Sequence, residues 1–270
     1  MSDDHEIVPA ICEMTSPVVS PQPPLGISHL LLWTFGAAVV LAVYRSLAGS
    51  SDLTPRMQFF QAAFQLVFSM LAGINVAAVV VYLRRLVVRD APLLTEPGHW
   101  LLVIAGASNL VAWLIFGVAV AIRAVQGAAQ PWELPFFMYW LPYSVGSFVA
   151  AAANWVALVR LREPLRWRLC FLVSGVFALA LGFTFGAMFL YSIQEPPDES
   201  FSAAVQAYAC LYPLDQLAGT VLLAFNLLAD RANDQRRDWI HRVGVIATLF
   251  QSIVSLAFYI LLMWGSAAGL

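Results

Sequence analysis

The segment LCFLVSGVFALALGFTFGAMFLYSI, Leu169–Ile193, runs for 25 residues without a charged side chain. As a helix it would span roughly 37 Å, more than the hydrocarbon thickness of about 30 Å in a typical bilayer. An apolar run of this length is typical of a membrane-spanning helix. The segment therefore predicts an integral membrane protein of the α-helical class.

Six further apolar stretches, each bounded by charged residues or proline, lie on either side of this segment. They are Ile27–Tyr44, Gln58–Leu83, His99–Ile122, Phe136–Leu161, Phe201–Ala229 and Val243–Trp264. Together the seven stretches predict an all-α bundle of seven transmembrane helices in one domain, 27–270. Pro213 inside Phe201–Ala229 predicts a kink. Residues 1–26 are acidic and rich in proline, with no arginine, and predict a disordered tail.

The composition supports the same class. The chain is 61% hydrophobic and 11% charged, whereas soluble domains are about 45–50% apolar and about 25% charged. All 14 basic residues are arginine, which excludes a retinal Schiff base and the usual P-loop and pyridoxal phosphate chemistry. The net charge of −2 provides no basic surface for nucleic acid. Cys12, Cys170 and Cys210 are too scattered to predict a zinc site or a disulfide framework.

Arginine is distributed unevenly between the two sides of the predicted bundle. Of the 14 arginines, 11 lie at or after the ends of the stretches Gln58–Leu83, Phe136–Leu161 and Phe201–Ala229. The positive-inside rule therefore predicts a cytoplasmic amino terminus and an external carboxyl terminus. The short loops leave no soluble domain for an active site and favour a bacterial inner membrane.

Asp215 is the one acidic residue placed deep inside a predicted span. A charged carboxylate at the bilayer centre costs at least about 2.5–3.5 kcal/mol, so we expect this side chain to face the bundle interior. At 3.6 residues per turn it shares a helix face with Tyr208, Tyr212 and Asn226. Polar residues of other predicted helices would complete a polar interior, which we interpret as a hydrated cavity: Gln65, Asn109, Tyr143, Ser147 and Asn154.

The role of Asp215 has two interpretations. In the functional one, its carboxyl group takes up and releases a proton or meets a polar solute, and burial favours the neutral, proton-carrying form. In the structural one, a protonated Asp215 is hydrogen-bonded to a tyrosine or asparagine and fixes the packing of the helices.

Small residues recur at four-residue spacing within Leu169–Ile193, a pattern that lets a neighbouring backbone approach closely. They are Ser174, Ala178, Gly182 and Gly186. We interpret this stripe as ordinary packing within the chain, with a contact between copies as the alternative.

Three histidines stand at the starts of predicted helices on the predicted cytoplasmic side. His29, His99 and His241 would be the candidates for a metal or haem site. No two of them lie three or four residues apart, and none lies deep within a span. We therefore expect no metal ion and no cofactor.

The sequence contains no nucleophile elbow, H-E-x-x-H, P-loop or dinucleotide fingerprint, so we do not expect an enzyme. Three hypotheses remain. The chain is a small-solute or proton-linked permeation module built around Asp215, a non-catalytic subunit or scaffold of a larger membrane complex, or a metal or haem redox protein. The polar interior favours the first hypothesis. The expected partner of the chain is the lipid bilayer, and under the second hypothesis another membrane protein or a second copy of the chain is also expected as a partner.

Overall fold

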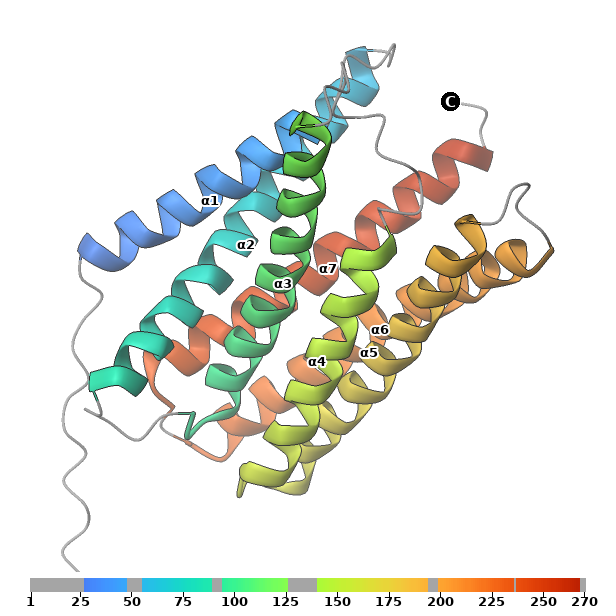
Figure 1. Cartoon of the computed structure of the whole chain (residues 1–270). Helices are drawn as coiled ribbons and strands as arrows, with labels where there is room; N and C mark the ends of the chain where they lie inside the picture. The colour runs from blue at the N-terminus through green and yellow to red at the C-terminus, as the bar shows by residue number, and fades with distance from the viewer. Residues whose placement is uncertain are drawn as a thin grey trace, which may run out of the picture.

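The computed structural model describes residues 27–47, 55–88, 94–125, 140–193, 199–235 and 237–267. All regular secondary structure in these ranges is helical (Figure 1). The helices are α1 (Ile27–Leu47), α2 (Pro55–Val88), α3 (Pro97–Val125), α4 (Trp140–Arg160), α5 (Leu165–Ser192), α6 (Glu199–Ala232) and α7 (Trp239–Ala267). The prediction of an all-helical protein is confirmed. The predicted tail, 1–26, lies outside the described residues.

Six of the helices, α2 to α7, contain segments that are long and apolar enough to cross a membrane. Their exposed surfaces carry many large apolar side chains, as lipid-facing surfaces do. The chain is therefore a multi-pass membrane protein. In α1 the apolar segment is the shorter Leu30–Ala42, so the seventh span stays a prediction.

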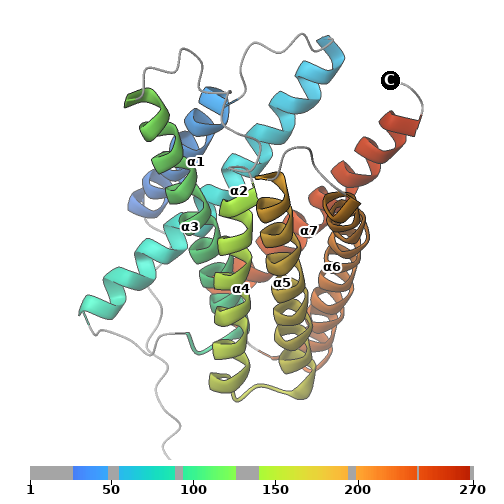
Figure 2. The same ribbon diagram turned by 45° about the vertical axis from the view of Figure 1, so that its right-hand side comes forward.

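Five helices form a closed ring. In chain order α3, α4, α5, α6 and α7 each pack against the next, and α7 packs against α3 to complete the circle (Figure 2). Helix α2 lies outside the ring against α3, with a smaller contact to α7, and α1 packs on α2. A core between the elements of the ring must therefore be filled by residues from all five helices or remain as a cavity.

The contact of α1 with α2 depends on Gly73. A Cβ atom there would lie 2.7 Å from the carbonyl oxygen of Trp33, closer than real side chains approach a backbone. The indole Nε1 of Trp33 donates a hydrogen bond to the carbonyl of Met70 at 2.9 Å. This close backbone contact attaches α1 to the outside of the bundle.

Most helices extend beyond the apolar stretches from which they were predicted. Helix α7 begins at Trp239 rather than Val243, because the carboxylate of Asp238 accepts the backbone N–H of His241 at 2.6 Å and caps the first turn. Helix α3 begins at Pro97 rather than His99, and proline suits the first position of a helix. Hydropathy marks the apolar part of a helix, whereas capping residues decide where it ends.

Candidate functional site

The helix ring surrounds a partly open cavity of about 560 Å³. All five ring helices contribute to its wall, and α2 adds Phe64 and Phe68. The volume falls within the range of about 300–1,000 Å³ that is typical of small-molecule sites. This cavity is therefore the first candidate for a functional site.

Most of the polar residues predicted to face the interior line this cavity. Asp215 lies in its wall together with other predicted residues from α3, α4 and α6: Asn109, Tyr143, Ser147, Asn154, Tyr208 and Tyr212. Gln65 is buried in α2 but lies outside the wall. Asn226 is also buried outside it, and its Nδ2 donates to the carbonyl of Leu222 at 2.8 Å. Of the predicted face of α6, Tyr208, Tyr212 and Asp215 thus line the cavity, whereas Asn226 lies beyond it.

Asp215 is the one acidic residue in the described cavity wall, which contains no arginine or histidine. Its Oδ2 accepts a hydrogen bond from Nε2 of Gln216 at 2.8 Å. The carboxyl group thus faces aromatic, amide and hydroxyl groups rather than a guanidinium or an imidazole. It can bind a proton or a positively charged ligand without displacing an internal ion pair.

Aromatic rings from all five ring helices form a continuous arc in the cavity wall. Neighbouring rings have centroids 5.3–6.0 Å apart, which is the normal range for aromatic pairs. We call this set the aromatic collar; in order around the ring of helices it consists of Phe116, Tyr143, Phe185, Tyr208, Tyr212 and Tyr259. Asp215 follows Tyr212 by one helical turn, so it lies on the side of the collar toward the end of α6.

Pro213 explains how Tyr259 is held in the collar. Proline has no N–H, so the carbonyl of Ala209, four residues earlier in α6, loses its usual helical partner. The hydroxyl of Tyr259 in α7 donates a hydrogen bond to this carbonyl at 2.6 Å. A freed backbone acceptor inside a membrane bundle is commonly satisfied by a neighbouring helix in this way.

We expect Tyr259→Phe to reduce the free energy of unfolding by about 1–3 kcal/mol, because it leaves the Ala209 carbonyl without a donor. In a Pro213→Ala background the backbone N–H of residue 213 returns. The same tyrosine substitution should then cost less than half as much. Unfolding in mixed micelles measures both values, and equal costs in the two backgrounds would contradict the assignment.

The small-residue stripe of α5 is divided between two roles. Ser174 and Ala178 line the cavity. Gly182 faces α4, where a Cβ atom would lie 3.1 Å from the ring of Phe148, and Gly186 lies near Ser144. The hydroxyl of Ser144 donates to the carbonyl of Gly182 at 2.9 Å. Both glycines thus contact α4 of the same chain.

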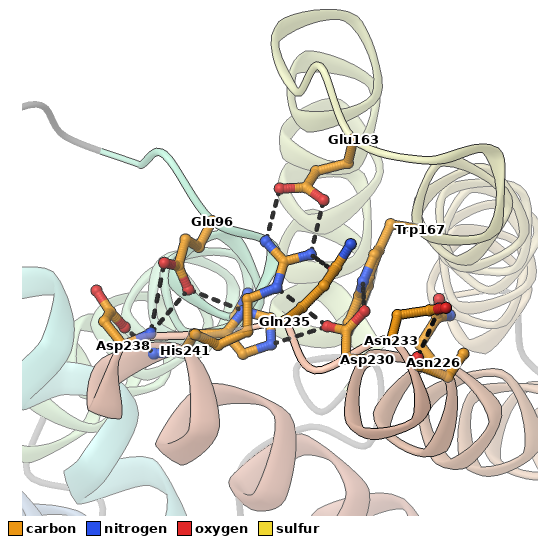
Figure 3. A network of polar contacts seen from close by, with 12 residues as sticks. Glu96, Glu163, Trp167, Asn226, Asp230, Asn233, Gln235, Asp238 and His241 are labelled. Carbon is orange, nitrogen blue, oxygen red and sulfur yellow. Dashed lines mark hydrogen bonds and ion pairs between the residues drawn. The ribbon is translucent and has the colours of Figure 1, made fainter. Parts of the chain in front are cut away.

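A second polar site lies at the end of the bundle where α4 and α6 end and α3, α5 and α7 begin (Figure 3). We call it the network end. The guanidinium of Arg237 donates to both carboxylate oxygens of Glu163 at 2.8 Å and to Asp230 at 3.1 Å. Asp230 also accepts hydrogen bonds from Arg166 and, at 3.4 Å, from the indole of Trp167. These groups join the α4–α5 turn to the α6–α7 turn.

The starts of α3 and α7 are joined at the network end by reciprocal contacts. The carboxylate of Glu96, which precedes α3, accepts the backbone N–H of Asp238, and Asp238 in turn is paired with His99 at 2.8 Å. The backbone N–H of Gly98 donates to Nδ1 of His241 at 3.0 Å. A Cβ atom at Gly98 would lie 2.5 Å from Cα of His241, so the crossing of these helices requires glycine.

An apolar layer separates the network end from the cavity. It consists of the buried cluster Trp100, Leu101, Ile104, Ala157, Leu161, Trp167, Cys170, Phe171, Leu223 and Val245. Leu101 and Leu223 of this layer also line the cavity, while Trp167 contacts Asp230. The cavity is therefore closed by packed side chains on the side of the network end.

The network end shifts the pKa values of two groups that lie outside the spans. Burial and the nearby charge of Asp238 raise the pKa of Glu96 from 4.5 to about 7. The pKa of the Arg237 guanidinium is held above its usual value by the hydrogen bonds to the carboxylate of Glu163, despite burial. Arg237 thus stays charged, whereas Glu96 changes its protonation near neutral pH.

The raised pKa of Glu96 predicts a pH-dependent stability. The folded state binds this proton more tightly than the unfolded state, so the stabilisation is complete below about pH 4.5 and is lost as the pH rises through about 7. We expect the unfolding free energy to fall between about pH 5 and about pH 8, and Glu96→Gln to flatten this fall. Unfolding in mixed micelles at these two pH values measures the fall in the wild type and in the variant. An equal fall in both proteins would contradict the role of Glu96.

Glu96, His99 and Asp238 also form a possible metal-ligand set, since one donor atom from each lies within 4.8 Å of the others. Sequence reasoning singled out His99 and His241 but missed the carboxylates around them. The side chain of His29 lies outside the described residues. Because the same donor atoms bind one another and the helix starts, the set is accounted for by capping, and the expectation of no metal stays a prediction.

Comparisons with known protein families, with curated proteins and with solved structures found no match for this chain.

Proposed function

We propose that the protein is a permeation module for a small solute, and that the cavity inside the helix ring is the binding site of this solute. The observation that carries the proposal is the position of Asp215, which is the one acidic residue in the described wall of a cavity large enough for a small molecule. A buried carboxyl group in such a place is typical of solute and proton pathways in membrane proteins.

The surroundings of Asp215 favour this role over a purely structural one. A carboxyl group that only fixes packing is expected between closely packed helices, whereas this one borders open space. A cavity with polar walls is filled by water or ligand, since an empty one would lose both packing and solvation. Tyr143 in the same wall is 45% exposed although it lies inside the bundle, so its side chain also borders open space.

The finer topology is also proposed. In this arrangement seven helices span a bacterial inner membrane, with the amino terminus in the cytoplasm and the carboxyl terminus outside, as the arginine distribution indicates. The network end then faces the cytoplasm and closes the cavity on that side, and the solute enters from the opposite side past the aromatic collar. Exchange of a proton at Asp215 would link solute binding to proton movement.

Cysteine labelling tests whether water and solutes reach the cavity. The three native cysteines are replaced by alanine, and Ser147→Cys is introduced in the cavity wall. A membrane-impermeant quaternary ammonium methanethiosulfonate is then applied to intact cells. We expect Ser147→Cys to react, because its thiol would face the aqueous cavity.

Val221→Cys provides the matched control. Val221 lies in α6, is 57% exposed and is not part of the cavity wall, so its substituted thiol should face lipid. We expect it to react at least about tenfold more slowly, because the thiolate that reacts is disfavoured in an apolar surrounding. Equal, slow reaction of both variants from both sides of the membrane would contradict the proposed function.

A further inference from the structure

The chemistry of the cavity wall defines the class of solute. Its one acidic residue is Asp215, and the described wall contains no arginine or histidine that would attract an anion. Binding an anionic solute would place two negative groups in one low-dielectric space, which is strongly unfavourable. The positive charge of a cation, in contrast, would balance the negative charge of the Asp215 carboxylate.

The aromatic collar adds a second attraction for positive charge. The faces of tyrosine, phenylalanine and tryptophan rings carry negative electrostatic potential and bind ammonium groups, particularly where water is excluded. Six rings of the collar line the cavity, and Trp113 and Trp140 lie in the same wall. Several rings around one charge form the arrangement by which proteins bind quaternary ammonium groups.

We propose that the solute is a small organic cation, a protonated amine or quaternary ammonium with an apolar or aromatic substituent, bound between the aromatic collar and Asp215. This inference rests on the proposed function and names the substrate class of the same cavity. Aromatic rings can contact both the apolar substituent and the charged group of such a solute. A mainly aromatic wall is therefore compatible with binding a cation.

Three soluble probes of similar shape and different charge test the class. Phenyltrimethylammonium is the cation, 2-phenyl-2-propanol its uncharged counterpart and benzenesulfonate the anion. Binding to the full chain in detergent is measured by isothermal titration calorimetry, with protein-free micelles as the blank. We expect the cation to bind at least about tenfold more tightly than the alcohol, and the anion to bind no more tightly than the alcohol.

Two variants assign the preference to the cavity. Asp215→Asn keeps the shape and much of the hydrogen bonding of the side chain, and should bring the affinities for the cation and the alcohol to within about twofold of each other. Tyr212→Leu should weaken cation binding by about 2- to 30-fold, whereas Tyr212→Phe, which keeps the ring, should change it less than about twofold. A thermal melt of each variant shows that it is folded.

The outcomes separate this inference from the proposed function. Equal affinity for cation and alcohol, tighter binding of the anion, or no binding of any probe overturns the assignment of an organic cation. If Ser147→Cys still reacts from water in that case, the permeation proposal stands with another solute. If Ser147→Cys is also unreactive, both proposals fail.

Discussion

Asp215→Asn is expected to reduce the uptake of phenyltrimethylammonium by the reconstituted protein at least about tenfold, the largest functional effect that the structure predicts. The asparagine side chain retains the size of aspartate but cannot balance the charge of a cation or carry a proton. Uptake is measured in liposomes containing the purified protein, with an inside-negative membrane potential as the driving force. A variant that transports as well as the wild type would favour the structural interpretation of Asp215.

Asp234→Asn is the matched control for this change. Asp234 follows the end of α6 and is exposed, so the same substitution removes a carboxylate from the chain without altering the cavity. Uptake by this control should equal that of the wild type. A similar loss in both variants would indicate an effect of net charge or of reconstitution rather than of the cavity.

Arg237→Met should lower the free energy of unfolding by about 3–5 kcal/mol, the largest effect expected on stability. The substitution leaves Glu163 without its bidentate partner and removes one of the donors to Asp230, while both carboxylates stay largely buried. Uncompensated buried charge costs more than the ion pair itself contributes. Unfolding in mixed micelles measures the loss.

Two further variants define the origin of this loss. Arg242→Met removes an exposed arginine from the first turns of α7 and should change stability by less than about 0.5 kcal/mol. Adding Glu163→Gln to Arg237→Met should recover part of the loss, since the neutral amide needs no cation. A loss below about 1 kcal/mol for Arg237→Met, or no recovery in the double variant, would contradict the account of the network end.

The cavity was the more predictable of the two polar sites. A charged residue at mid-depth must face the interior, and helical periodicity then identifies its neighbours, so Asp215, Tyr208 and Tyr212 could be grouped from the sequence. Depth was less predictable: Asn226 shares the same face of α6 but bonds to the carbonyl of Leu222 beyond the cavity. The collar partner Tyr259 was missed, although Pro213 provided a signal, because a proline shows that a carbonyl is freed but not which helix supplies the donor.

The network end was not predictable in its contacts. Glu163 and Arg237 are separated by 74 residues and lie in different turns, so no local pattern links them. In the sequence these residues resemble ordinary loop charges, and the arginines were used only to infer orientation. Their pairing depends on which helix ends meet, and this is decided by the closure of the ring between α7 and α3. Asp230 is the clearest example, since it lies just beyond the predicted apolar stretch but is 5% exposed.

The most direct test of permeation through the cavity is a covalent block. Ser147→Cys protein without its native cysteines is reconstituted, and phenyltrimethylammonium uptake is measured before and after labelling with the quaternary ammonium methanethiosulfonate. If the solute passes through the cavity, labelling reduces uptake to the level of protein-free liposomes, while uptake by Val221→Cys protein is unchanged. Uptake that persists after complete labelling of Ser147→Cys would show that the cavity is not the pathway and would contradict the central claim.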